Sequence, residues 1–174
     1  MSEPATEITP ATIEHLNALL AGDEVFAERF GMPVEPLYMD LPDEPEIAEQ
    51  ALTWSKTMLE DGAPPEWHSH LFIEPGEPRL IGFGGYKGAP TDSTVEIGYA
   101  LAPSYRGRGH ATAAARELVR RARAAGVERV IAHTLPEHNA STRLLERLEF
   151  QLVDEVVHPD DGPIWRWELD LSAS

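Results

Sequence analysis

A strand, a glycine-containing turn and a long helix follow one another directly in residues 95–126, and this order constrains the fold more than any other feature. Large apolar residues alternate with small or acidic ones over 95–101, which predicts a half-buried strand. Apolar residues then recur with helical spacing over 109–125, and Gly126 stands where such a helix ends. A helix in this position predicts a mixed sheet in which it crosses between two neighbouring parallel strands.

Further elements are predicted on both sides of this unit. Helical spacing of apolar residues favours helices over 11–30 and 46–60, and the prolines between them indicate loops. Two apolar runs, 71–73 and 80–83, flank a turn and predict an antiparallel hairpin. The rest of the chain is predicted to form a strand, a helix and two strands, at 129–134, 139–148, 150–157 and 163–169. The fold class is therefore α/β (α+β), with helices packed on a mixed sheet.

The composition fits a single domain over residues 1–174, with 1–10 as a flexible N-terminal arm. Apolar residues make up 42% and charged residues 25% of the chain, as in ordinary globular domains. No apolar run reaches the roughly 18 residues that a membrane helix needs, and the acidic start lacks the basic residues of a secretory signal. Cysteine is absent, as is common in reducing compartments. We therefore expect a cytoplasmic protein that does not bind a membrane.

Charge is distributed unevenly along the chain. The net charge of −16 argues against nonspecific nucleic acid binding, which depends on neutralising phosphates with basic residues. Residues 1–100 hold 4 basic and 19 acidic side chains, whereas residues 101–150 hold 9 basic and 5 acidic ones. This local reversal favours a compact polyanionic ligand, or it is only the solvated face of a helix.

The turn between the central strand and helix has the composition of a phosphate-binding loop. Gly107 and Gly109 allow a tight bend that exposes backbone N–H groups, and the start of a helix adds partial positive charge. Arg106 and Arg108 add full charges. A turn that needs glycine for its geometry alone would look the same.

Two common phosphate-binding motifs fit this turn badly. The nucleoside triphosphate loop, Gly-x-x-x-x-Gly-Lys-Ser/Thr, does not occur in the chain. The dinucleotide fingerprint, Gly-x-Gly-x-x-Gly, has Thr112 in place of its third glycine. A protein that binds a nicotinamide dinucleotide, NAD(P), therefore remains only a remote alternative.

A third pattern, Arg/Gln-x-x-Gly-x-Gly/Ala, fits Arg106–Ala111 at every specified position. With this loop and the segments 95–99 and 139–146, the chain resembles the GCN5-related N-acetyltransferase (GNAT) superfamily, in particular its ribosomal-protein N-terminal acetyltransferases. The resemblance is specific over residues 94–157, which would form the acyl-CoA-binding core. It implies a central, mostly antiparallel mixed sheet of about six to seven strands, splayed between two parallel strands and flanked by about four helices.

The resemblance also implies that the loop binds the pyrophosphate of acetyl-coenzyme A (acetyl-CoA), while the pantetheine arm lies between the splayed strands. The cofactor-binding residues so implied are Leu101, Ala102, Arg106, Gly107, Arg108, Gly109, His110, Ala111, Thr112 and Asn139. Asn139 is expected to hydrogen-bond the cofactor arm, and Asn also favours a helix N-cap. Arg116, Arg120 and Arg123 either reach the 3′-phosphate of the nucleotide or remain solvated, and Arg116 is the expected contact of the three.

The implied reaction is direct attack of a primary amine on the thioester of acetyl-CoA, through a tetrahedral intermediate. Glu96 is the candidate base if burial raises its pKa, and a solvated or salt-bridged Glu96 is the alternative. Many relatives protonate the departing thiolate with a Tyr of the helix at 139–148, which here contains none, so Ser141 is the candidate donor. Glu149 also replaces a glycine that is usual in the family.

The acidic surface favours a cationic acceptor amine. The alternative to an enzyme is a sensor that binds acyl-CoA but has lost its chemistry. His68 and His70 form a possible metal pair without a third ligand, so we expect them to be structural or substrate-lining, and no metal to bind. We expect a monomer or homodimer. Four large residues either line a substrate pocket or belong to the core: Met39, Trp54, Trp67 and Phe83.

Overall fold

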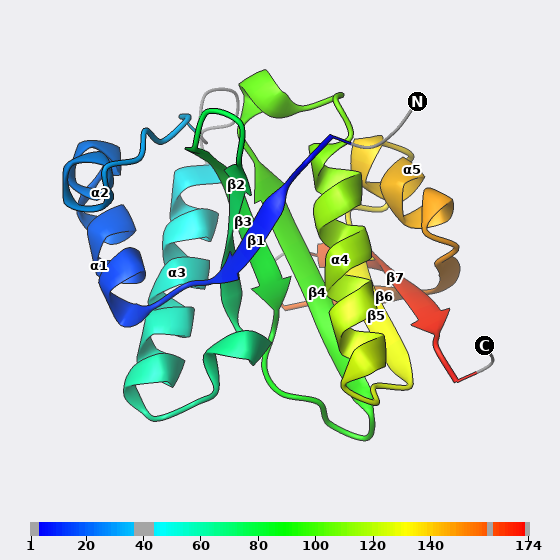
Figure 1. Cartoon of the computed structure of the whole chain (residues 1–174). Helices are drawn as coiled ribbons and strands as arrows, with labels where there is room; N and C mark the ends of the chain where they lie inside the picture. The colour runs from blue at the N-terminus through cyan, green and yellow to red at the C-terminus, as the bar shows by residue number, and fades with distance from the viewer. Residues whose placement is uncertain (1–3, 37–43, 160–161, 173–174) are drawn as a thin grey trace.

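The structure is a computed structural model that describes residues 4–36, 44–159 and 162–172. Within them, a seven-stranded sheet has the order β1-β2-β3-β4-β5-β7-β6 (Figure 1). The strands are β1 (Glu7–Pro10), β2 (Ser69–Glu74), β3 (Arg79–Tyr86), β4 (Thr94–Leu101), β5 (Arg129–Thr134), β6 (Gln151–His158) and β7 (Gly162–Asp170). The helices are α1 (Ile13–Ala21), α2 (Asp23–Phe30), α3 (Glu44–Glu60), α4 (His110–Ala124) and α5 (Ala140–Arg147), with short 3-10 turns η1 (Pro65–Trp67) and η2 (Pro103–Tyr105).

Neighbouring strands are antiparallel except for β4 and β5, which run parallel. Their parallel pairing covers only Thr94 to Glu96, opposite Arg129 to Ile131. Beyond Glu96, β4 stays paired with β3 as far as Leu101, while β5 stays paired with β7 as far as Thr134. The two parallel strands therefore separate at Glu96, which confirms the predicted mixed, mostly antiparallel and splayed sheet.

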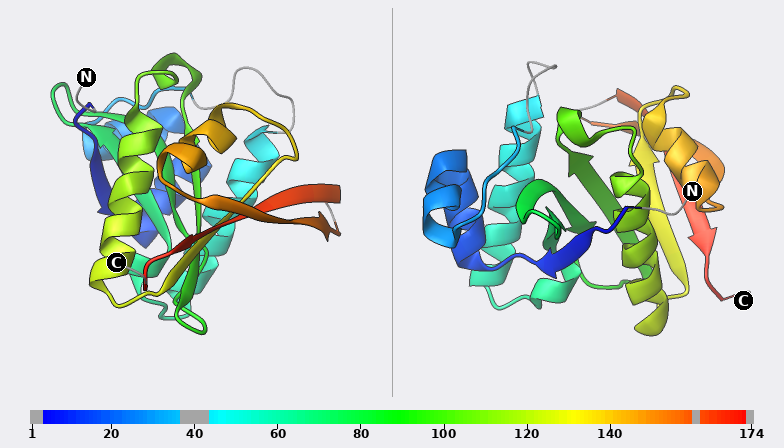
Figure 2. Two further views of the ribbon diagram at one scale, coloured as in Figure 1. Left: turned by 90° about the vertical axis from the view of Figure 1, so that its right-hand side faces the viewer. Right: turned by 45° about the horizontal axis from the view of Figure 1, so that its top comes forward.

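Helices cover both faces of the sheet (Figure 2). On the face that we call the α4 face, the apolar side of α4 packs against Val95, Ile97 and Leu101 of β4. On the opposite face, the α3 face, helices α1 to α3 pack against residues such as Phe83 and Ala100. Because side chains alternate along a strand, Glu96 and Gly98 lie on the α3 face with Ala100. The strand thus borders two separate cores.

The N-terminal region differs from the prediction in two places. Residues 7–10, expected in a flexible arm, form β1 against β2. Only one side chain of this strand, Ile8, is buried, so the sequence shows no alternation of apolar and polar residues there. The helix predicted over 11–30 is two helices, α1 and α2, because Gly22 adopts a φ of 139° that interrupts helical geometry.

Helix α3 begins earlier than predicted, at Glu44. It includes Pro45, which the first turn of a helix accepts because its missing N–H is not needed there. In the described part of the chain, no helix combines the length and hydrophobicity required to cross a bilayer.

Candidate active site

The predicted phosphate loop joins β4 to α4 and is built largely from backbone. Gly107 and Gly109 adopt φ angles of 78° and 92°, in the left-handed region that favours glycine. Gly109 is the N-cap of α4 and offers no side-chain cap to the helix. The first N–H groups of a helix have no partner within it, and N–H groups in this position are the kind that bind anions.

Arginine side chains surround this loop. Arg106 donates from Nε to the carbonyl oxygen of Leu101 at 3.1 Å, which folds the loop back onto the end of β4. The guanidinium of Arg108 stacks over the ring of Tyr105, 4.9 Å from its centroid. His110 and Thr112, in the first turn of α4, are both buried.

The N-terminal segment reaches the same loop, a contact that the sequence did not reveal. Thr6 Oγ1 lies 3.0 Å from His110 Nδ1. A Cβ placed on Gly109 would lie 3.1 Å from Cδ of Pro4. Any side chain at position 109 would therefore meet both an unfavourable φ and a close neighbour.

On the α4 face, two hydroxyl groups meet across the gap between β4 and α5. Tyr99 of β4 and Ser141 of α5 lie 3.1 Å apart through their hydroxyl oxygens. Burial raises the pKa of the Tyr99 hydroxyl, so this group keeps its proton at neutral pH. The alternation over 95–101 places Tyr99 on a strand face but cannot indicate this partner, which is 42 positions away.

Asn139 holds the start of α5 in the expected N-cap geometry. Its side-chain oxygen accepts a hydrogen bond from the N–H of Thr142 at 3.0 Å, and its own N–H donates to the Thr142 hydroxyl at 2.8 Å. This reciprocal pair fixes Ser141 in the first turn of the helix. The Asn139 amide group also lies 3.4 Å from a carboxylate oxygen of Glu137.

On the α3 face, Glu96 is the centre of a polar cluster with Lys87 and His133. Its Oε2 lies 2.6 Å from Lys87 Nζ and 3.1 Å from His133 Nδ1. Burial by itself raises the pKa of the Glu96 carboxyl, but the Lys87 charge and the hydrogen bonds from Lys87 and His133 outweigh burial and lower it. The expectation of a raised pKa was therefore wrong, and the salt-bridged alternative describes the structure.

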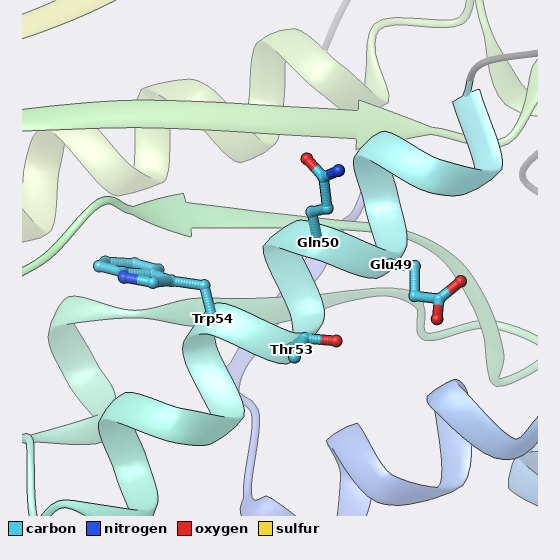
Figure 3. A pocket seen from close by; sticks show the side chains of 4 residues that line it. All are labelled: Glu49, Gln50, Thr53 and Trp54. Carbon is cyan, nitrogen blue, oxygen red and sulfur yellow. The ribbon is translucent and has the colours of Figure 1, made fainter.

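A groove of about 460 Å³ opens on α3 and is lined by Glu49, Gln50, Thr53 and Trp54 (Figure 3). Trp54 is 43% exposed, and its ring packs 5.1 Å from that of His68. A Cβ placed on Gly88, which follows Lys87, would lie 4.0 Å from the Trp54 indole. The groove therefore lies near the Glu96 cluster.

The other three residues considered for a pocket differ from Trp54. Trp67 packs on the ring of Tyr86 at 4.9 Å, and Phe83 is buried in the core on the α3 face. Met39 lies outside the described residues. Arg116 lines a second groove, between α4 and residues near β1.

His68 and His70 are both buried in the structure. The Nδ1 atom of His70 lies 2.9 Å from the carbonyl oxygen of His68, and burial lowers the pKa of His70 to about 4. Among the described residues, no group of three or more His, Cys, Asp or Glu side chains is placed to hold a metal ion.

Glu149 preserves the turn that a glycine usually makes. Its φ is 70°, so the backbone keeps the left-handed geometry although a side chain is present. The N–H of Phe150 then donates to Leu145 at 2.9 Å, which ends α5. The substitution therefore leaves this turn intact.

Comparison with known proteins identifies the family. The model of the acetyltransferase (GNAT) domain matches residues 6–151. No curated protein sequence matches the chain. Similar solved structures include the ribosomal-protein-S5-alanine acetyltransferase from Vibrio fischeri, 15% identical over 98% of this chain and 95% of that one, with a TM-score of 0.65.

Two further similar structures contain forms of coenzyme A. RimJ from Mycobacterium smegmatis, in complex with CoA-disulfide, is 17% identical over 98% of this chain and 84% of that one, with a TM-score of 0.67. The protein yncA from Salmonella typhimurium, with its cofactor acetyl-CoA, is 20% identical over 96% of this chain and 94% of that one, with a TM-score of 0.59. The domain match, the splayed sheet and the glycine loop agree, and this chain belongs to the GNAT family of acetyltransferases.

Proposed function

We propose that this acetyltransferase moves the acetyl group of acetyl-CoA to a primary amine, by direct attack of the neutral amine on the thioester through a tetrahedral intermediate. One observation carries the proposal: β4 and β5 separate at Glu96, and the uncapped start of α4 follows the end of β4. An extended arm with a phosphate at one end fits a gap between strands that leads to a helix N-terminus.

The loop supplies the donors that a pyrophosphate needs. In the proposal, the N–H groups of His110, Ala111 and Thr112 bind phosphate oxygens, with positive charge from Arg106 and Arg108. Gly107 and Gly109 shape the turn so that these groups point outward, and the backbone of Leu101 and Ala102 lies along the pantetheine arm. Asn139 would contribute its amide group to the same arm, on the opposite side of the gap.

Glu96 is proposed to receive the acceptor amine. Its carboxylate already holds one ammonium, that of Lys87 at 2.6 Å, and this ion pair supports a role in binding a primary amine. A lowered pKa makes a carboxylate a weak base but keeps it ionised at neutral pH. We therefore infer that Glu96 binds the acceptor ammonium and accepts its proton through water, beside the hydrogen-bonded His133.

Ser141 is proposed to protonate the departing thiolate, together with Tyr99. The two hydroxyls form one hydrogen-bonded pair, so a proton given up by Ser141 is replaced from Tyr99. Because an ordinary thiol has a pKa of about 8.5, its thiolate requires only a weak acid. In this proposal, Tyr99 of β4 supplies the proton that many relatives take from a Tyr of the helix corresponding to α5.

We infer that the acceptor is cationic. The carboxylate of Glu49 and the exposed indole of Trp54 line one groove near Glu96, and aromatic faces and carboxylates both attract ammonium groups. The net charge of −16 favours the approach of a cation from a distance. A polyamine, an amino sugar and a basic peptide N-terminus all have this chemistry.

The test is mass spectrometry of these three amine classes after incubation with the full chain and acetyl-CoA. An acetylated product supports the proposal if Glu96→Gln and Ser141→Ala lose turnover but still bind acetyl-CoA in a thermal-shift assay. Glu60→Gln, an exposed position on α3, is the matched control and should keep full turnover.

Two other results would contradict the proposal. Binding of acetyl-CoA without acetylation of any amine would favour the sensor, for which the lowered pKa of Glu96 is the supporting observation. Stabilisation by NADH but not by acetyl-CoA would indicate a dinucleotide-binding site instead.

A further inference from the structure

Lys87 places a primary amine of the chain itself at the carboxylate proposed to receive the acceptor. Lysine is rare in this sequence: of 14 basic side chains, only Lys56 and Lys87 are lysines. Arginine would form the same ion pair with Glu96, but an arginine cannot serve as an ordinary amine nucleophile because its guanidinium stays protonated. A lysine at this position therefore adds a potential amine nucleophile, which an arginine would not.

Two contacts hold Lys87 along β4. Its ammonium lies 2.6 Å from Glu96 Oε2, and its backbone N–H donates to the carbonyl oxygen of Glu96 at 2.8 Å. Between these two points, its Cε lies 3.4 Å from where a Cβ of Gly98 would stand. The absence of a side chain at Gly98 thus leaves room for the stem of Lys87 to cross the strand.

This position coincides with the start of the gap between the parallel strands. Glu96 is the last residue of β4 that pairs with β5, and Gly98 lies just inside the gap. The Lys87 side chain is 57% exposed, so the amine is accessible and can move within reach of its stem. It occupies the place that the proposed function gives to an external amine.

We propose that Lys87 is itself an acetyl acceptor, so that the enzyme acetylates this residue in its own active site. The inference rests on the proposed function. The Lys87 ammonium gives a proton to water hydrogen-bonded to Glu96, and the neutral amine attacks the thioester carbonyl carbon. A carbon–nitrogen bond forms and the carbon–sulfur bond breaks. The Tyr99–Ser141 pair protonates the thiolate, and the second proton lost by the attacking nitrogen restores the pair. One acetyl group moves from sulfur to nitrogen, and one proton is released.

Acetylation would change the cluster in a definite direction. The product amide carries no charge, so Glu96 loses the largest influence that lowers its pKa, while burial, which raises it, remains. Glu96 also loses its competing ammonium. The modified enzyme should therefore bind an external cationic amine more tightly, with a lower KM.

The test is to incubate the full chain with acetyl-CoA alone and to follow acetylation at each lysine by peptide mass spectrometry. Lys56, on α3, is an internal control for spontaneous acetylation. Lys87 should be acetylated at least about tenfold faster than Lys56, because the site holds its amine close to the thioester. Glu96→Gln should remove this preference, and Lys56→Arg should leave acetylation of Lys87 unchanged.

A parallel reaction with spermidine and a basic peptide separates the two proposals. If either amine is acetylated while Lys87 is modified no faster than Lys56, self-acetylation is overturned and the proposed function stands. If acetyl-CoA binds but neither Lys87 nor any added amine is acetylated, both proposals are overturned.

Discussion

The two faces of β4 present different chemistry to the same gap. On the α4 face, the groups are the backbone of a glycine turn and the neutral pair of Tyr99 and Ser141. On the α3 face, they are the ion pair of Lys87 with Glu96 and the imidazole of His133 beside it. In the proposed function, this arrangement separates binding of an anionic carrier from binding of a cationic amine, because the strand β4 stands between the two sites. Changes on the two faces should therefore have different effects.

Removal of the charge on the α3 face should have the largest effect. Glu96→Gln keeps the shape of the side chain but removes the proton acceptor, so kcat/KM for an amine should fall by about 100-fold or more. Steady-state kinetics measures this fall, and calorimetry should show unchanged affinity for acetyl-CoA. A large loss of acetyl-CoA affinity in this variant would break the proposed division between the faces.

The reciprocal change distorts the glycine turn on the α4 face. Gly109→Ala places a Cβ at a φ of 92° and against Pro4, so the start of α4 must shift. The Kd for acetyl-CoA should rise by about tenfold, because the N–H groups of α4 lose their alignment with the phosphates. Gly76→Ala, in a turn with open space around it, is the control and should bind normally. Equal Kd values for the two variants would argue against the loop as the phosphate site.

The pH dependence of activity tests the lowered pKa of Glu96. With Lys87→Met, the carboxyl loses the positive charge that lowers its pKa, so its pKa rises. Activity that needs ionised Glu96 is lost as the pH falls through this pKa, so the acid limb of the pH–rate profile should move to higher pH. Lys87→Arg retains the charge and should keep the limb near its wild-type position. A shift toward lower pH in Lys87→Met would contradict the assignment.

The smallest expected effect concerns stability, away from both faces. Glu149 is strained because its φ is 70°, in the left-handed region that favours glycine. Glu149→Gly should relieve this strain and stabilise the fold by about 0.5–1 kcal/mol. Glu146→Gly, in the regular part of α5, should destabilise it by about 1 kcal/mol. Urea unfolding measures both. Activity should be unchanged in Glu149→Gly, because this turn lies outside the gap.

The parts of the molecule that sequence could predict are those that depend on local residues. The alternation over β4, the helical period of α4 and the glycines between them are all read within one segment. Gly22 is a local signal as well, but a single glycine within a helical pattern does not predict a break. Strand β1 was not predicted because its four residues form a strand mainly through pairing with β2, some 60 residues away. Its own short sequence pattern contributes little to strand formation.

The candidate site divides in the same way. The loop residues were predicted from a motif, whereas the partners of Glu96 are brought to it by strand register. Lys87 follows β3, and His133 lies on β5 beyond its pairing with β4. The pKa of Glu96 therefore could not be judged from its own strand, and neither could the contact between Tyr99 and Ser141.

The most direct test of the account is to follow backbone amide shifts by NMR while acetyl-CoA is added to the full chain. The amide shifts should change most, as acetyl-CoA is added, at residues 107–112. Smaller shift changes should occur along 99–102 and at Asn139. Residues 49–54, in the groove on α3, should change little until an amine is added. Shifts confined to the α3 groove, with 107–112 unaffected, would contradict the claim that the start of α4 binds the carrier.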